Sequence, residues 1–288
     1  MPELPEVETV RLQLLYHLPK KTIKGVEVFH SKSVGFDEEF EDTFVGKTIE
    51  HIDRVGKLMI VSFARQRNLF LLAHLKMTGQ FFFVAKDGEL SGGGHSMTEA
   101  DVRGLPNKHT RVAFYFTDGS ALYFNDMRLF GYIKRASKEA VERARAGFGP
   151  EPIADDFDCE WFAAALKKKR TSIKAALLNQ AFVAGLGNIY VDEALFRAGV
   201  RPTRRADKLT KAEAARLCRA AGEVMRESIT VGGTTFQHFV DTKGENGNFT
   251  KQLQIFGKQN TPCITCGTTV QKIRVAGRGT HYCPKCQK

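Results

Sequence analysis

The chain has 288 residues, 42% of them hydrophobic and 26% charged, with a formal net charge of +11. This length favours two domains, the composition is that of an ordinary globular protein, and no apolar run reaches the roughly 20 residues that a bilayer span requires. The chain opens with Glu3, Glu6 and Glu8. A secretory signal would begin with a basic stretch and an apolar core, so we expect none here and expect a cytoplasmic or nucleoid location.

The positive charge is concentrated in the second half of the chain. Residues 1–150 hold 21 basic and 19 acidic side chains, whereas residues 151–288 hold 22 and 13. Lysine and arginine displace the condensed counterions of a phosphate backbone, so this asymmetry favours a polyanionic partner. A basic surface that serves only solubility would give the same numbers, and motifs must decide between the two.

The first half predicts a helix followed by a β-rich domain. The segment from Pro5 to Leu18 places apolar residues at helical spacing, namely Val7, Val10, Leu14 and Leu18. Short β-rich runs follow between Thr22 and Arg135, and Asp118-Gly119 separates the last two, as in a tight hairpin. These runs predict a β-sandwich or flattened barrel. Residues 86–110 are polar and glycine-rich and predict a long loop.

The second half predicts helices and then a small β module. Glycines and prolines break residues 137–153, which we predict to be a linker. Helical patterns follow at 156–169, 171–180, 189–198 and 210–230. The predicted fold class is therefore α+β. Its predicted parts are an N-terminal β-sandwich domain at 1–136, a helical domain at 154–250 and a cysteine-rich module at 251–288.

Four cysteines near the C-terminus form two Cys-x2-Cys pairs separated by 16 residues, and they are Cys263, Cys266, Cys283 and Cys286. This spacing is typical of a zinc ribbon, in which four thiolates leave no open coordination position and the zinc is structural. Two disulfides are the alternative, which a reducing compartment disfavours. Cys159 and Cys218 stand apart in the sequence, and we expect two separate buried thiols.

Two glycine-rich turns indicate contact with phosphate groups. Ala184-Gly185-Leu186-Gly187-Asn188 lies between two predicted helices, where backbone N–H groups can bind an anion. A helical hairpin needs glycine in any case, so this turn alone is a weak signal. Inside the cysteine module, Gly277 and Gly279 flank Arg278 and would let it approach a phosphate closely.

Several of these motifs resemble those of the formamidopyrimidine-DNA glycosylase family, the bacterial enzymes that repair 8-oxoguanine. They occur in collinear order as MPELPEVETV at the start, HLKMTG at 74–79, GPEP at 149–152, AGLGNIYVDEALF at 184–196, VGGTTFQHF at 231–239 and the cysteine pairs. The resemblance implies a helix-two-turn-helix within 154–250, one structural Zn²⁺ and no catalytic metal or organic cofactor. It also implies a monomer that excises oxidised purines from double-stranded DNA and then nicks the strand at the resulting abasic site.

The resemblance assigns the chemistry to the N-terminus. Such an enzyme needs an amine that attacks the sugar C1′ and forms a Schiff base, and an α-amino group, with a pKa near 8 against about 10.4 for lysine, is more often neutral. That amine is Pro2, free only once Met1 is removed; apart from the resemblance, Pro2 indicates only a helix start. Glu3 matches the general acid/base. Lys57 matches a lysine that contacts phosphates and assists β-elimination, and Arg278 an arginine linked to δ-elimination.

The resemblance also implies residues that open the duplex. A stacked base must be flipped out, and inserted side chains fill the gap it leaves. Met77, Arg128 and Phe130 match the family's void-filling residues, with Arg128 able to pair with the orphaned cytosine. Residues 231–249 resemble a loop that closes over the flipped base. The other implied contacts are His109, Lys169 and Asn188 with DNA, and Glu6, Lys174, Thr234 and Thr235 on the lesion side.

The sequence departs from the family pattern near the void-filling residues. Met127-Arg128-Leu129-Phe130-Gly131 stands where the family usually has Pro-Arg-Arg-Phe-Gly, and Lys76 and Thr78 replace a small residue and a serine. Two alternatives follow: an endonuclease VIII-like enzyme for oxidised pyrimidines, or a non-catalytic zinc-dependent DNA-binding relative. Leu4, Met77 and Phe130 favour the purine enzyme. The presence of Pro2, Glu3, Lys57 and Arg278 argues against loss of catalysis.

Overall fold

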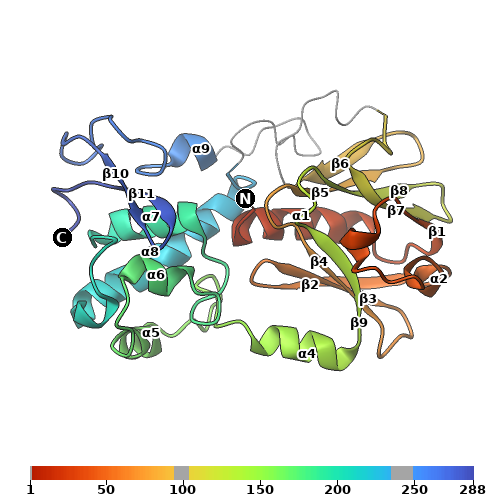
Figure 1. The fold of residues 1–288 in the computed structure, drawn as a ribbon, viewed down its shortest axis with the longest axis horizontal. Coiled ribbons are helices and arrows are strands. Elements are labelled where there is room, and N and C mark those ends of the chain that lie inside the picture. The colour runs from red at the N-terminus through yellow and green to blue at the C-terminus, as the bar shows by residue number, and fades with distance from the viewer. Residues whose placement is uncertain (1, 94–103, 235–248) are drawn as a thin grey trace. The chain divides into compact units, whose positions relative to one another are not determined.

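The computed structural model describes residues 2–93, 104–234 and 249–288 (Figure 1). Contacts divide the chain into two compact units. Unit 1 takes the chain up to Ala146 together with a later segment that starts at Val231, and unit 2 comprises Gly147–Thr230 and Phe249–Lys288. Among the described helices, none is both long enough and apolar enough to cross a membrane.

Unit 1 is built from helices and two antiparallel sheets (Figure 1). In its described residues, one sheet has the strand order β1-β7-β8-β5-β6 and the other has the order β2-β3-β4-β9. The elements are α1 (Leu4–His17), β1 (Ile23–Val28), the 3-10 helix η1 (Ser31–Val34), α2 (Phe40–Phe44), β2 (Ile49–Val55), β3 (Leu58–Phe63), β4 (Phe70–His74), β5 (Gly79–Val84), β6 (Leu90–Gly93), β7 (Thr110–Phe116), β8 (Ala121–Asp126), β9 (Tyr132–Ala136) and α4 (Lys138–Ala146).

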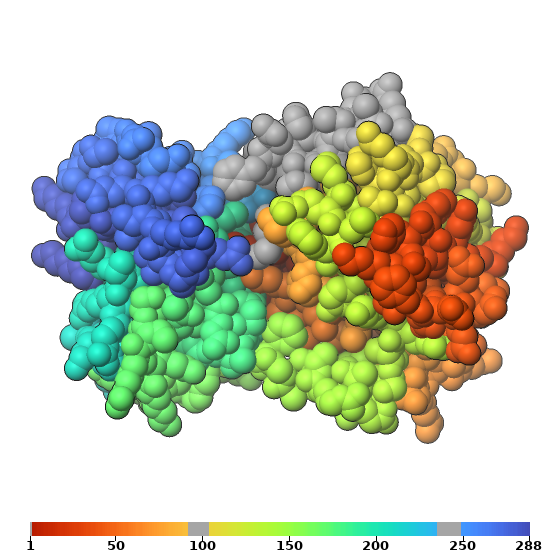
Figure 2. Space-filling model, in the orientation of Figure 1, coloured from red at the N-terminus to blue at the C-terminus, as the bar shows by residue number. Residues whose placement is uncertain are grey.

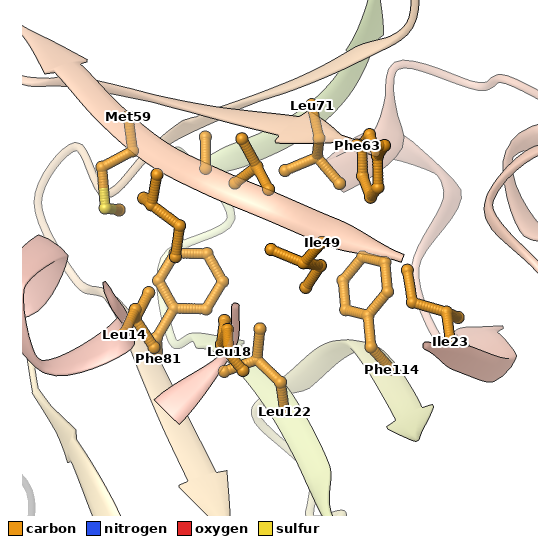
Figure 3. Close-up of a pocket in the computed structure, with 13 residues that line it drawn as sticks. Leu14, Leu18, Ile23, Ile49, Met59, Phe63, Leu71, Phe81, Phe114 and Leu122 are labelled. Carbon is orange, nitrogen blue, oxygen red and sulfur yellow. The ribbon is translucent and has the colours of Figure 1, made fainter. Parts of the chain in front are cut away.

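The core of unit 1 lies between its two sheets, and α1 contributes to it. The predicted apolar face of α1 is confirmed, since Val7, Val10 and Leu14, and Leu18 directly after the helix, are each at most 4% exposed. Side chains such as Leu14 from α1, Phe114 from β7 and Met59 from β3 surround a cavity of about 30 Å³ (Figure 3). The cavity has an apolar lining and the volume of about one water molecule, so it is a packing gap and not a ligand site.

Unit 1 differs from the sequence-based prediction at two places. The predicted loop 86–110 contains strand β6, which pairs with β5 from Phe81 to Val84. The predicted linker 137–153 begins with helix α4, whose Arg145 forms an ion pair with Asp53. The glycine-rich β6 has a weak local preference and depends on strand pairing, whereas α4 consists of good helix formers and packs Val141 against Ile60.

Unit 2 is mainly helical and ends in a hairpin. Its elements are α5 (Cys159–Leu166), α6 (Ile173–Leu178), α7 (Asn188–Ala198), the 3-10 helix η2 (Ala206–Lys208), α8 (Lys211–Thr230), α9 (Phe249–Gln252), β10 (Gln271–Val275) and β11 (Arg278–Tyr282). Helix α7 packs against α8 and against β11. In the space-filling view, the blue hairpin and the green helical segment of this unit are in direct contact (Figure 2).

The prediction of two separate thiols in unit 2 was wrong. Cys159 at the start of α5 and Cys218 in α8 form a disulfide with their Cα atoms 5.7 Å apart. The two residues are 59 positions apart in the chain, and only the packing of α5 on α8 brings them together. No local spacing rule identifies such a pair, because the distance depends on the tertiary fold.

Candidate DNA-processing site

The N-terminus of α1 is tied to a distant segment of unit 1 through Glu6. Pro2 and Glu3 are both buried. The carboxylate of Glu6 accepts hydrogen bonds from the Glu3 amide at 2.8 Å and from the amide and hydroxyl of Thr234 at 2.7 and 2.8 Å. Gly233, with a φ of +87°, lies so close that a Cβ would be 3.1 Å from the Glu6 carboxylate. Glu6 therefore fixes residues 233–234 beside the first turn of α1.

Lys57 lies in the turn between β2 and β3, and α1 holds that turn. Arg54 donates to the carbonyl of Gly56 and to the carboxylate of Glu8, both at 2.8 Å. Burial acts to raise the pKa of Glu8, but hydrogen bonds from Arg11 and Arg54 outweigh it and the pKa is lowered. Glu8 therefore stays ionised and anchors the turn. Lys57 is only 7% exposed.

His74 lies beside Lys57, a placement that the sequence-based assignment missed. The strand pairing of β3 with β4 sets Leu58 opposite His74. Burial, followed by the charges of Lys76 and Lys57, lowers the pKa of His74 to about 3, so the imidazole is neutral. Its Nδ1 accepts a hydrogen bond from the Lys76 amide at 2.9 Å, which leaves the proton on Nε2. The HLKMTG motif contains this histidine and was the available signal.

The three predicted void-filling residues come together from two loops of unit 1. Met77 lies between β4 and β5, and Arg128 and Phe130 lie between β8 and β9. The Arg128 guanidinium is 3.4 Å from the Met77 sulfur and its Cζ is 4.9 Å from the centre of the Phe130 ring. Phe130 is 49% exposed and the neighbouring Met127 is 57% exposed. We call Met77, Arg128 and Phe130 the wedge.

His109 is half-buried at the edge of the same region. Its carbonyl accepts a hydrogen bond from the Asp126 amide at 2.9 Å, and its amide donates to Asn107 at 2.9 Å. The backbone of His109 is thus fixed next to the end of β8, from which the Arg128 loop starts. The structure therefore brings His109 near the wedge, as a shared site requires.

In unit 2, the turn between α6 and α7 meets the C-terminal hairpin. Gln180 stabilises the turn by accepting from the Gly185 amide at 2.9 Å and donating to the Leu186 carbonyl at 2.8 Å. Asn188, the first residue of α7, donates to the Gly279 carbonyl at 3.0 Å. Gly279 follows the exposed Arg278, so this hydrogen bond joins the start of α7 to the strand that carries Arg278. The exposed guanidinium of Arg278 suits a phosphate.

Lys169, predicted to bind DNA, and Lys174, predicted to lie on the lesion side, have different environments. Lys169 is partly exposed, with its ammonium 5.0 Å from the centre of the Phe182 ring. Lys174 is fully buried and forms an ion pair with Asp192 at 2.6 Å, and it also donates to the Gly279 carbonyl at 3.3 Å. Asp192 in turn accepts from the His281 amide at 2.8 Å. These contacts give Lys174 the role of joining α6, α7 and β11.

The four predicted metal-binding cysteines converge at the base of the hairpin. Their sulfur atoms all lie within 4.8 Å of one another, with Cys263–Cys286 at 3.9 Å and Cys266–Cys283 at 3.5 Å. A zinc tetrahedron with Zn–S bonds of about 2.3 Å has edges of about 3.8 Å, so the geometry fits. Burial and the neighbouring thiols raise the pKa of Cys286 to about 12. If all four thiols were ionised, their negative charges would repel one another. A bound divalent cation would neutralise these charges.

The residues predicted for the site are divided between the two units. Unit 1 holds Pro2, Glu3, Glu6, Lys57, Met77, His109, Arg128, Phe130 and Thr234, and unit 2 holds Lys169, Lys174, Asn188, Arg278 and the four cysteines. Thr235, along with most of the predicted loop 231–249, lies outside the described residues. Each unit thus has its own set of residues suited to a nucleic acid. Unit 1 has the buried Pro2 and Glu3 together with the wedge, and unit 2 has side-chain donors that suit phosphate groups.

Comparison with known proteins covers all three parts of the chain. Residues 1–133 match the model of the formamidopyrimidine-DNA glycosylase N-terminal domain, residues 148–240 match the H2TH domain of the same enzymes, and residues 261–288 match the zinc finger found in FPG and IleRS. The H2TH match and the zinc-finger match agree with the α6–α7 turn and with the cysteine cluster.

Individual relatives match over the full chain. The formamidopyrimidine-DNA glycosylase of Listeria monocytogenes is 38% identical over 292 aligned residues, covering all of both chains. The structure of Lactococcus lactis Fpg in complex with DNA containing an abasic site superposes with a TM-score of 0.86 at 32% identity. A MutM complex with DNA containing carbocyclic 8-oxo-G has a TM-score of 0.85 at 33% identity, and both structures cover all of this chain and are themselves fully covered. This chain belongs to the formamidopyrimidine-DNA glycosylase family.

Proposed function

We propose that the protein excises oxidised purines, 8-oxoguanine and formamidopyrimidines, from duplex DNA and then cleaves the strand as an AP lyase. The observation that carries the proposal is the buried start of α1, where Pro2 precedes Glu3 and the Glu6 carboxylate fixes Glu3 through its amide. The relatives include a complex with DNA containing 8-oxo-G and a complex with DNA containing an abasic site.

The proposed reaction starts at the nitrogen of Pro2 after removal of Met1. The neutral amine attacks C1′ of the damaged nucleotide, the N–C1′ bond forms, and the glycosidic bond breaks with its electron pair passing to the departing base. Glu3 takes the proton from the Pro2 nitrogen and delivers it to the ring oxygen of deoxyribose, which opens the sugar and leaves an iminium on Pro2. Loss of the C2′ proton expels the 3′ phosphate, and a second elimination expels the 5′ phosphate. Hydrolysis of the iminium then frees Pro2.

In the same proposal, the remaining residues of unit 1 hold and distort the DNA. Lys57 and the neutral His74 supply an ammonium and an Nε2–H donor next to each other, which suits the phosphates around the lesion. The wedge fills the space of the flipped nucleotide, and Arg128 faces the orphaned base. His109 contributes a further DNA contact. Glu6 and Thr234 shape the lesion side of the site, and Thr235 is assigned there by the family motif alone.

Unit 2 supplies phosphate contacts and a metal-stabilised hairpin. Asn188, Arg278 and Lys169 bind the DNA backbone, with Arg278 also assisting δ-elimination. One structural Zn²⁺ held by the four cysteines would stabilise the hairpin that carries Arg278 and would take no part in the reaction. Lys174, although first assigned to the lesion side, is proposed to act through structure because its ammonium is buried against Asp192. We further infer a monomer that works on the nucleoid in the bacterial cytoplasm.

Borohydride trapping on a duplex with 8-oxoguanine opposite cytosine tests the nucleophile. We expect the natural chain to form a covalent complex whose cross-link maps to residue 2, and Pro2→Gly to trap at least about tenfold more slowly. Glu3→Gln should lose base excision by roughly 10²- to 10⁴-fold while still cross-linking to a preformed abasic site. Intact mass should show Met1 removed.

The outcomes separate the remaining functions. Cross-linking only to duplexes with oxidised pyrimidines would assign the protein to the endonuclease VIII-like activity. Salt-sensitive binding without any cross-link, on either class of lesion, would leave a DNA-binding relative without chemistry and would reject the proposed reaction.

A further inference from the structure

A single buried carboxylate connects the two loops that carry the wedge. Asp126, the last residue of β8, has no exposed surface. One of its oxygens accepts hydrogen bonds from the Thr78 hydroxyl and from the Arg128 amide, the latter at 3.1 Å. The other oxygen accepts from the Gly131 amide at 2.6 Å. The carboxylate thus holds both ends of the Arg128–Phe130 segment and also the loop that follows Met77.

The Thr78 hydroxyl strengthens this connection because it bonds in two directions. It donates to Asp126 and also accepts from the Arg128 amide at 3.1 Å. Strand pairing places Gly79 opposite Asp126, so the start of β5 is in register with the end of β8. Arg111 donates to the Asp126 carbonyl at 2.7 Å and supplies a positive charge near the buried carboxylate. Among the described residues of the Met77 loop, Thr78 is the one whose side chain donates a hydrogen bond to Asp126.

Both loops have backbone conformations that need such support. Lys76 and Leu129, neither of them glycine, have φ values of +51° and +57°, in the left-handed region that side chains disfavour. A Cβ on Gly79 would lie 2.5 Å from the Leu75 carbonyl, and one on Gly131 would lie 2.9 Å from the Phe124 ring. The loops are tightly folded against their strands. Each left-handed residue directly precedes a wedge residue, so loosening its loop would displace Met77 or Phe130.

We propose that Asp126 and Thr78 are positioning residues that keep the wedge in one geometry and thereby determine discrimination of the base opposite the lesion. The inference rests on the proposed function of the wedge. Arg128 reads that base, its amide is bonded to both Asp126 and Thr78, and its guanidinium contacts Met77 and Phe130. An arginine pairs with a base through directed hydrogen bonds, so a small displacement of its loop weakens the preferred pair more than the others.

The test measures binding to duplexes that contain a tetrahydrofuran abasic analogue opposite cytosine or opposite adenine. Binding needs no excision, so this test stands even if the proposed reaction fails. We expect the natural chain to prefer cytosine and Arg128→Ala to lose the preference. Thr78→Val, which keeps the side-chain shape but removes the hydroxyl, should reduce the cytosine-to-adenine affinity ratio roughly fivefold. Thr78→Ser, which retains the hydroxyl, should restore it.

Asp126→Asn is a second variant, and it should reduce the ratio further because its amide group would face the Gly131 N–H. Thr22→Val is the matched control, since it also removes a threonine hydroxyl, one that is partly buried and bonds the hydroxyl of Thr48. The inference is overturned if Thr78→Val keeps the natural ratio, or if it weakens both duplexes equally while thermal unfolding falls in parallel. It is also overturned if the natural chain shows no preference between the two bases.

Discussion

At the scale of single residues, the surroundings of a side chain decide its role more than its type does. Lys57 and Lys174 are both lysines that the family motif assigns to the site. Lys57 lies in a turn beside His74, whereas Lys174 is enclosed with Asp192. The sequence could predict that these positions matter, because the motifs fix them in order. It could not predict that Lys174 is buried or that its partner Asp192 also bonds the distant His281, because both depend on the tertiary fold.

His74 provides a test at this scale through pH. Its pKa of about 3 lies below the ordinary value of 6.5, so the unfolded chain binds a proton between these values and the folded chain does not. The stability associated with neutral His74 is therefore complete above the ordinary pKa and is lost as pH falls towards 3. We expect the urea midpoint to drop between about pH 7 and pH 5, and His74→Gln to reduce that drop.

Circular dichroism measures this unfolding, and His51→Gln at an exposed position of β2 is the control. The control should leave the pH dependence of the midpoint as in the natural chain. An unchanged drop in His74→Gln would show that other groups account for the acid sensitivity.

At the scale of elements, local patterns predict well where apolar spacing is regular. The faces of α1 and the positions of α5 to α8 follow from such spacing. Strand β6 and helix α4 did not, because Leu90–Gly93 depends on pairing with β5 and α4 lies in a segment that glycines and prolines dominate further on. Helix α7 illustrates a further limit. The carboxylate of its Glu193 accepts hydrogen bonds from the three consecutive backbone amides of residues 254–256, and burial still raises the pKa of Glu193. The local pattern of α7 could not predict these distant partners.

The Lys174–Asp192 pair gives a prediction for how α6, α7 and β11 are joined. Lys174→Met would leave the buried Asp192 without its cation, and removal of one partner of a buried pair costs about 3–5 kcal/mol. The single tryptophan, Trp161 in α5, reports on unit 2 in urea unfolding followed by fluorescence. Lys168→Met, at an exposed position, should change stability by less than about 0.5 kcal/mol. Equal effects of the two variants would refute a stabilising role for the pair.

At the scale of the whole molecule, the uneven distribution of charge along the chain follows its division into two units. The more basic half of the sequence forms most of unit 2, where Asn188, Arg278 and Lys169 lie. Composition alone could indicate a polyanionic partner, and the motif order could name most of the site. Neither could give the Asp126 connection between the wedge loops, which depends on two strand ends lying in register.

The salt dependence of DNA binding tests this distribution. The logarithm of affinity should fall linearly with the logarithm of salt concentration, by about 0.9 per phosphate contact in duplex DNA. Arg278→Ala should reduce the slope by about one, because it removes one such contact. Arg274→Ala, on the neighbouring strand of the same hairpin, is the matched control and should leave the slope unchanged. A slope that does not differ between the natural chain and Arg278→Ala would remove Arg278 from the phosphate contacts.

The split course of unit 1 has a consequence for how the protein is made. Glu6 bonds Thr234, yet the whole stretch from Gly147 to Thr230 lies in unit 2 and is synthesised between them. At roughly 5–20 residues per second, the ribosome needs several seconds more after Ala146 before Thr234 emerges. During that interval the β-sandwich can form while the first turn of α1 still lacks its partner. The nascent chain therefore completes the surroundings of Glu3 only after most of the helical unit has been translated.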